Sequence, residues 1–252
     1  MSRETSRPHY GLLDTVRGGC ILSMVAYHGM YDLVDIFGLP SAWYVGLLGY
    51  VWQQSICWTF ILLSGMCWRL SRHHVKRGLL LVGCGAAITL VTWMVMPSQR
   101  ILYGVLNLLG LSALLLIPCD KVFRKIPAWA GLAGALALFA LTKNVSRGSL
   151  GFEGLVLCPL PEQLYSTDLL AVVGFPSPSF WSTDYFPLLP WFFLYCAGYF
   201  LWGLLDQSGR AKQLLKPGLR PLSFLGRHSL LIYLIHQPAL MAVFTAAGWI
   251  WG

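Results

Sequence analysis

The chain has 252 residues, of which 56% are hydrophobic and 11% charged, and its formal net charge is +8. Because soluble domains carry about twice that charged fraction, the composition excludes an ordinary soluble globule and predicts a polytopic membrane protein. The positive charges are clustered between apolar segments, so we expect them to meet membrane lipid headgroups, with no nucleic acid as partner.

Seven apolar segments approach or exceed the length that crosses the ~30 Å hydrocarbon core of a bilayer as a helix. They are residues 17–37, 46–68, 78–96, 101–118, 127–142, 186–205 and 223–249. A backbone inside a bilayer must satisfy its own hydrogen bonds. We therefore expect an all-α membrane helix bundle of about seven transmembrane helices, folded as a single domain over residues 1–252.

Lysine and arginine are distributed unevenly among the connecting segments. Basic clusters follow the second, fourth and sixth apolar segments, and Arg3 and Arg7 precede the first. In an alternating seven-span chain these clusters share one side, whereas most loop acids lie on the other. The positive-inside rule then places the N-terminus in the cytoplasm and the C-terminus outside.

The first segment is unusual because a membrane helix carries four ionisable side chains, Asp14, Arg17, His28 and Asp32. At ~100° per residue, Arg17 and His28 return to nearly one face, about 16 Å apart along the axis, and Asp32 follows His28 by one turn. Intramembrane ionisable residues are costly and usually functional, so this stripe is a candidate site. In the alternative interpretation, Asp14 caps the helix and pairs with Arg17, while His28 and Asp32 face a polar crevice.

Other polar side chains inside apolar segments have two interpretations each. Gln53 and Gln54 either line a substrate cavity or hold helices together. His236 is a second candidate for the central cavity or an interhelical hydrogen-bonding residue. Asp184 either meets an incoming substrate or caps the helix that follows it. The seven cysteines show no metal-ligand spacing, and we expect packing residues and no metal site.

The segment 143–185 is too long for a plain connection and is rich in glycine and proline. Its apolar stretches L-V-L-C-P-L and L-L-A-V-V-G-F are too short to span a bilayer. We expect an outside-facing lid or re-entrant piece with a short interfacial helix.

Four motifs in this order resemble the heparan-α-glucosaminide N-acetyltransferase-like family of bacterial integral membrane proteins, within the transmembrane acyltransferase superfamily. They are L-L-D-T-V-R-G-G at 12–19, T-F-I-L-L-S-G at 59–65, D-Y-F-P-L-L-P-W at 184–191 and G-R-H-S-L-L-I-Y-L-I-H-Q-P at 226–238. The resemblance implies a multi-pass protein of the bacterial inner (cytoplasmic) membrane. The implied activity is transfer of an acetyl group from cytosolic acetyl-CoA to a sugar-like or lipid-linked acceptor.

The resemblance also gives the polar residues roles. His28, Asp32 and His236 are the expected catalytic group, with His28 as general base or transient acyl carrier. Gln53, Gln54 and Asp184 are expected to bind the acceptor. The expected ligands of the CoA phosphates are Arg17, Arg69, Arg72, Lys76, Arg77, Arg227 and His228. A homodimer would compensate for so short a chain. The alternative is a non-enzymatic carrier or flippase that uses the buried stripe for proton or anion handling.

Overall fold

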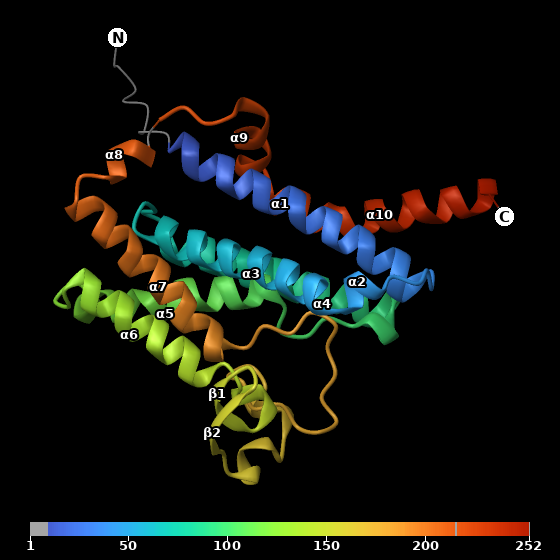
Figure 1. Cartoon of the computed structure of the whole chain (residues 1–252), viewed down its shortest axis with the longest axis horizontal. Coiled ribbons are helices and arrows are strands. Elements are labelled where there is room, and N and C mark those ends of the chain that lie inside the picture. Colours follow the sequence, from blue (N-terminus) through green and yellow to red (C-terminus); the bar gives the residue numbers. More distant parts are fainter. Residues whose placement is uncertain (1–9, 215, 252) are drawn as a thin grey trace. The chain divides into compact units, whose positions relative to one another are not determined.

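The computed structural model describes residues 10–214 and 216–251, with side chains described as far as residue 247, so Arg3 and Arg7 lie outside the described residues. The seven predicted segments coincide with seven long helices (Figure 1). They are α1 (Gly11–Tyr31), α3 (Leu47–Trp68), α4 (His74–Val95), α5 (Val105–Phe123), α6 (Ala128–Thr142), α7 (Leu188–Gln207) and α10 (Ser229–Trp251). Three short helices are α2 (Ala42–Val45), α8 (Ala211–Leu214) and α9 (Arg220–Arg227).

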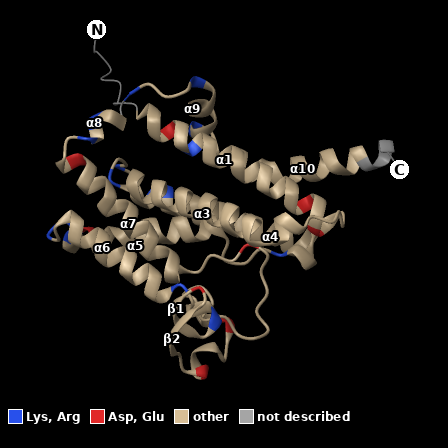
Figure 2. Ribbon diagram, viewed as in Figure 1, with Lys and Arg blue, Asp and Glu red and all other residues tan. Residues whose placement is uncertain are grey.

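Five of the helical segments are long and apolar enough to cross a membrane. They are α4, α5, α6 extended to Arg147, α7, and α10 as far as Ala247. α1 and α3 have 21 and 22 residues, but polar side chains within them lower their hydropathy. Lys, Arg, Asp and Glu lie mostly at helix ends and in loops (Figure 2). The chain is therefore a multi-pass helical membrane protein, while the count of seven crossings and the orientation of the termini stay predictions.

The helix boundaries differ from those predicted most clearly in the first and the last segments. α1 begins at Gly11 and ends at Tyr31, and a π-helical turn, Asp32–Ile36, follows it directly. The predicted last segment, 223–249, is two helices, because the backbone leaves helical geometry at His228 (φ −99°, ψ 15°) between α9 and α10. His228 is thus a junction residue rather than part of a continuous membrane helix.

The chain divides into two compact units, residues 1–63 with 206–252 and residues 64–205. The first contains α1, α2, most of α3 and α8–α10, and the second contains α4–α7 and the segment between α6 and α7. The sequence predicted a single acyltransferase-like domain over residues 1–252, and this stays a prediction.

In the first unit, α1 and α9 pack backbone against backbone. A Cβ added at Gly18 would overlap the carbonyl group of Leu222, and one added at Gly226 would overlap the carbonyl oxygen of Asp14. Glycine is therefore required at both positions for this close approach. On another part of α1, Trp52 of α3 donates its indole N–H to Ser23 Oγ at 2.8 Å.

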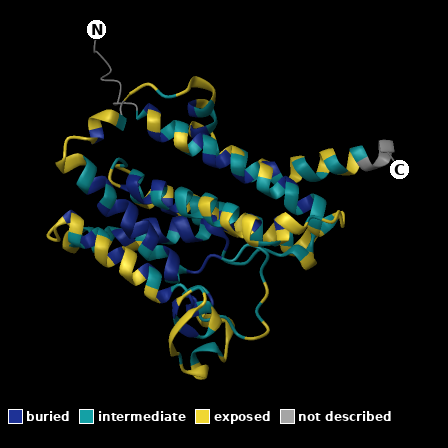
Figure 3. Ribbon diagram, viewed as in Figure 1, coloured by how far each residue is buried: buried dark blue, intermediate teal, exposed yellow. Residues whose placement is uncertain are grey.

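In the second unit, the buried faces of α5 and α7 form the core, and α7 is largely dark blue in Figure 3. Trp68 at the end of α3 donates its indole N–H to the carbonyl of Ala113 at 2.9 Å. The Tyr199 hydroxyl donates to Asp120 Oδ1 at 2.6 Å, and Arg124 donates to the other oxygen at 2.7 Å. Buried hydrogen bonds of this kind fix the register of neighbouring helices.

The segment between α6 and α7 is not purely helical, so the all-α prediction needs one correction. Strands β1 (Ser149–Phe152) and β2 (Leu155–Pro159) form an antiparallel hairpin. The expected short interfacial helix takes the form of two 3-10 turns, Glu162–Tyr165 and Asp168–Leu170. Burial raises the pKa of the Tyr165 phenol, so its hydroxyl stays a protonated donor at neutral pH and bonds the Val145 carbonyl at 2.5 Å.

Candidate functional site

Four buried or partly buried polar side chains meet between α1 and α10 in the first unit, and we name them the α1–α10 polar cluster: His28, Asp32, His236 and Gln237. The imidazole rings of His28 and His236 are 4.8 Å apart between centroids, at 64° to each other. Gln237 donates its side-chain N–H to Asp32 Oδ1 at 2.5 Å. The structure thus places His28 against His236 and Asp32 against Gln237, two contacts between segments from opposite ends of the sequence.

The cluster contains polar atoms that have no hydrogen-bond partner among the described residues. They are Asp32 Oδ2, Gln237 Oε1 and His236 Nε2, and each is buried. Asp32 is fully buried, and His236 is 8% exposed. Buried polar groups are nearly always paired, so these three atoms make the cluster a candidate site.

The backbone of α10 fixes the protonation pattern of the His236 ring. Its Nδ1 lies 2.6 Å from the carbonyl oxygen of Tyr233. A carbonyl oxygen only accepts, so Nδ1 carries the hydrogen and, in the neutral ring, Nε2 presents a free lone pair. That nitrogen has the arrangement of a general base.

The hydrogen-bond partner of Asp32 is Gln237 of α10, and a catalytic role for Asp32 stays a prediction. The i,i+4 spacing predicted that Asp32 lies one helical turn after His28. In the structure Asp32 Oδ1 accepts the side-chain N–H of Gln237. His28 instead has ring contacts with Tyr27, Tyr31 and His236. Sequence reasoning did not select Gln237 as a site residue; its position next to His236 in the last motif was the available signal.

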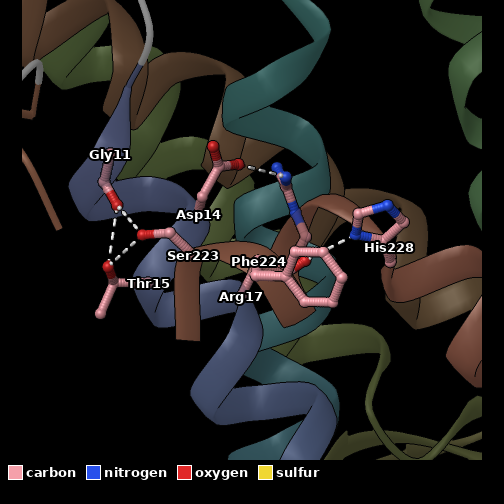
Figure 4. A network of polar contacts seen from close by, with 7 residues as sticks. All are labelled: Gly11, Asp14, Thr15, Arg17, Ser223, Phe224 and His228. Carbon is pink, nitrogen blue, oxygen red and sulfur yellow. Dashed lines mark hydrogen bonds and ion pairs between the residues drawn. The ribbon is translucent and has the colours of Figure 1, made fainter. Parts of the chain in front are cut away.

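Arg17 lies near the other end of α1 and forms an ion pair with Asp14 at 3.0 Å (Figure 4). This confirms the pairing in the alternative interpretation of the stripe. Asp14 is not the helix cap, since α1 begins three residues earlier and has no side-chain cap. Beside this pair, Ser223 of α9 lies 2.8 Å from Thr15 Oγ1, which ties the two helices together by their hydroxyls.

Arg227 and His228 follow the contact between α1 and α9. Both are exposed, and His228 Nδ1 lies 2.9 Å from the carbonyl oxygen of Phe224, whose ring is 4.4 Å away. Because Gly226 touches the α1 backbone, Arg227 leaves α9 beside the turn of α1 that carries Arg17. These three basic side chains therefore belong to one end of the first unit.

Gln53 and Gln54 are engaged within α3. Gln54 accepts a hydrogen bond from the Trp58 indole at 3.0 Å, and its amide lies 3.4 Å from Gln53 Oε1. These contacts agree with the structural interpretation of the two glutamines, and a role in acceptor binding stays a prediction.

The remaining predicted residues lie in the second unit. Arg69 lies over the ring of Tyr199, 5.1 Å from its centroid. Arg72 and Lys76 line a shallow depression at the start of α4. Arg77, which follows Lys76, is exposed. Asp184 accepts the backbone N–H of Val105 at 3.3 Å, so it caps α5 and not the helix that follows it in sequence.

Among residues 10–214 and 216–251, no three His, Cys, Asp or Glu side chains are grouped as metal ligands. No disulfide joins the cysteines of these residues, and Cys158 is exposed.

The fold and the cluster define a multi-pass helical membrane protein with a buried imidazole–carboxylate site. The family model described as Heparan-alpha-glucosaminide N-acetyltransferase, catalytic, matches residues 9–238, and the chain belongs to this family. Membership confirms the resemblance and indicates a membrane acetyltransferase. The match extends from the start of α1 to the residue after Gln237 and so includes the whole polar cluster. Searches among curated proteins and among solved structures gave no match.

Proposed function

We propose that the protein transfers an acetyl group from acetyl-CoA to a sugar-like or lipid-linked acceptor at or across the membrane. The α1–α10 polar cluster is the proposed place of transfer. The observation that carries the proposal is the buried, unpartnered Nε2 of His236, whose tautomer is fixed by the Tyr233 carbonyl, beside the ring of His28.

In this proposal His236 is the general base. Its Nε2 takes the proton of the acceptor hydroxyl or amine while the acceptor's oxygen or nitrogen attacks the thioester carbonyl. The carbon–sulfur bond then breaks, the thiolate of CoA leaves, and the proton returns to it. His28, whose ring contacts the imidazole that becomes charged, is in this proposal the second imidazole of the site.

Asp32 stabilises this site electrostatically. A buried carboxylate favours a neighbouring imidazolium, provided that a donor holds its orientation. Gln237 is that donor, because its N–H occupies Asp32 Oδ1 and leaves Oδ2 for a proton-bearing partner.

The donor would enter by its phosphates at basic side chains. Arg17, Arg227 and His228 are the proposed ligands from the first unit, and the second unit offers its own group, Arg69, Arg72, Lys76 and Arg77. Eleven residues of α1 separate Arg17 from His28, about 16 Å along the axis, which suits the pantetheine arm between the phosphates and the thioester. We also propose that the chain crosses a bacterial inner membrane seven times with its N-terminus in the cytoplasm, where the donor is found. We further propose that it forms a homodimer.

The test uses purified protein in proteoliposomes with acetyl-CoA and a panel of amino-sugar and polysaccharide acceptors, and it measures release of the CoA thiol. His236→Ala should lower turnover by about 10²–10⁴-fold, the usual contribution of a general base, with acetyl-CoA binding retained. Gln213→Ala, at an exposed glutamine of α8 outside the cluster and the proposed phosphate ligands, is the control and should leave turnover unchanged.

Two outcomes would contradict the proposal. If His236→Ala turns over normally while His28→Ala does not, the base is His28 and the assignment within the cluster is wrong. If the protein shows no stabilisation by saturating acetyl-CoA and instead moves solute across liposomes, it is a carrier.

A further inference from the structure

An apolar patch lies on the hairpin between α6 and α7, made by Leu155, Val156 and Leu157 of β2 with Leu169 of the second 3-10 turn. These side chains are 60%, 62%, 60% and 82% exposed. Each residue of β2 is exposed along its length, and the strand is yellow in Figure 3. The patch is also uncharged, since residues 154–161 read G-L-V-L-C-P-L-P.

The patch is exposed on both faces of the strand, which is unusual for a hairpin in water. Successive side chains of a strand point to opposite faces, so the exposure of three consecutive residues leaves neither face packed. A two-stranded sheet is marginal alone, and an exposed apolar edge is prone to aggregate. An apolar surface outside the hairpin is the environment that fits these residues.

The hairpin is nevertheless held rigidly. Asn144 is 2% exposed and donates its side-chain amide to the carbonyls of Glu153 (2.9 Å) and Leu155 (3.2 Å). The Glu153 carboxylate is balanced by Lys143 at 3.2 Å and Arg147 at 3.6 Å. The Glu153 carboxylate is therefore paired, and these three side chains together carry one net positive charge, which suits a phospholipid headgroup.

The hairpin also lies next to a membrane helix. α6 ends at Thr142, only seven residues before β1 begins, and β1 contacts α6. Leu136, Leu138 and Leu141 of α6 are exposed on a helix that is apolar enough to cross a membrane. The patch is thus continuous in the chain with a lipid-facing surface.

We propose that the apolar patch on β2 and Leu169 inserts into the bilayer at the headgroup–acyl boundary of the leaflet where α6 ends. The occupant is phospholipid, and the insertion is shallow, about 5–10 Å as for other interfacial elements. The hairpin is then a membrane-seated element rather than a free lid. This inference does not depend on the proposed function.

The test uses Cys158, which lies in β2 and is exposed. In a variant whose other six cysteines are replaced by Ala, an environment-sensitive fluorophore is attached to Cys158 and the protein is placed in nanodiscs. The quenchers are phosphatidylcholine with a nitroxide near the acyl carbonyl, the same lipid with a nitroxide near the chain end, and aqueous iodide. The matched reporter is Ser179→Cys with Cys158→Ala, because Ser179 is exposed and polar in the same segment.

We expect the shallow nitroxide to quench the Cys158 reporter at least about twofold more than the deep one, and iodide to quench it least. The Ser179→Cys reporter should show the opposite order. Replacing Leu155 and Leu157 by Ser should reduce the lipid quenching of the Cys158 reporter; both are mostly exposed, so the fold should survive.

Equal quenching of the two reporters by iodide would overturn the proposal. Oxidative cross-linking of two Cys158 thiols, with emission that is insensitive to lipid, would overturn it also, because a second copy would then cover the patch.

Discussion

Alanine at Gly18 should separate α1 from α9, whereas alanine at the adjacent Gly19 should not. The Cβ of an alanine at position 18 would lie 2.6 Å from the carbonyl carbon of Leu222 and 3.0 Å from its Cα. At Gly19 a Cβ meets nothing within 4 Å. Two neighbouring glycines in one helix therefore offer the same substitution with and without a steric clash.

The magnitude follows from the atoms involved. Ordinary contacts begin near 3.4 Å, so the two backbones must move apart by roughly 1 Å, and no side chain can rotate away because the opposing atoms are backbone. Overpacking of this kind costs about 1–3 kcal/mol. At Gly19 the same change removes only the flexibility of glycine and should be neutral or stabilising by up to about 1 kcal/mol.

The consequence for the donor site is specific. α9 ends in Arg227, directly after the glycine that touches α1, so its displacement moves a proposed phosphate ligand away from Arg17. Gly18→Ala should therefore lower the midpoint of thermal unfolding and weaken binding of desulfo-CoA, a non-reactive donor analogue. Both quantities are measured on the same nanodisc preparation, the first by intrinsic tryptophan fluorescence and the second by calorimetry.

The matched variant decides the interpretation. If Gly18→Ala and Gly19→Ala have equal midpoints and equal affinities, the close approach of α1 and α9 does not exist in the folded protein. If Gly18→Ala destabilises the protein but binds the analogue normally, the packing is correct and the phosphate assignment of Arg227 is wrong.

Two further substitutions test the hydrogen bonds that hold the cluster and the hairpin. Gln237→Leu leaves the buried Asp32 carboxylate without its hydrogen-bond donor and should lower the free energy of unfolding by about 1–3 kcal/mol or more. Turnover should fall more strongly than the affinity for acetyl-CoA. Gln213→Leu, at an exposed glutamine of α8, is the control, and equal turnover in the two variants would refute the role of Gln237. Asn144→Ala removes two hydrogen bonds to hairpin carbonyls and should lower the stability of the hairpin by about 1–3 kcal/mol. Limited proteolysis should then cleave the hairpin while the helices stay folded. Unchanged cleavage would show that the strands are held by other contacts.

The positions of the long helices could be predicted because hydropathy and length set them independently of tertiary contacts. The break at His228 was not predicted, because a single glycine such as Gly226 is tolerated inside a helix and hydropathy alone indicates one continuous segment over 223–249. The hairpin was also beyond sequence reasoning. Its strands have four and five residues, and an apolar strand of that length is indistinguishable from a loop without its pairing partner.

Three of the four residues of the cluster were selected from the sequence, His28 and Asp32 near the start of the chain and His236 near its end. Periodicity along α1 selected His28 and Asp32, since both face one direction of a single helix. It could not select the partner of Asp32, because Gln237 lies 205 positions away and their meeting is a property of tertiary packing. The same limit explains Asp184, which caps a helix 79 positions earlier in the chain.

α1 and α3 show how composition and function are linked in this fold. Both have the length of a membrane helix, yet neither is among the five segments that are apolar enough to cross by composition alone. The residues that lower the hydropathy of α1 include His28, which packs on the ring of His236, and Arg17. Those of α3 include Gln54, whose carbonyl accepts from an indole. Polar atoms inside a membrane protein persist when they are paired or when they serve chemistry. α3 satisfies the first condition within its own turns. The α1–α10 polar cluster instead keeps buried atoms of Asp32, His236 and Gln237 without a partner among the described residues, and this difference is the physical reason to place the reaction there.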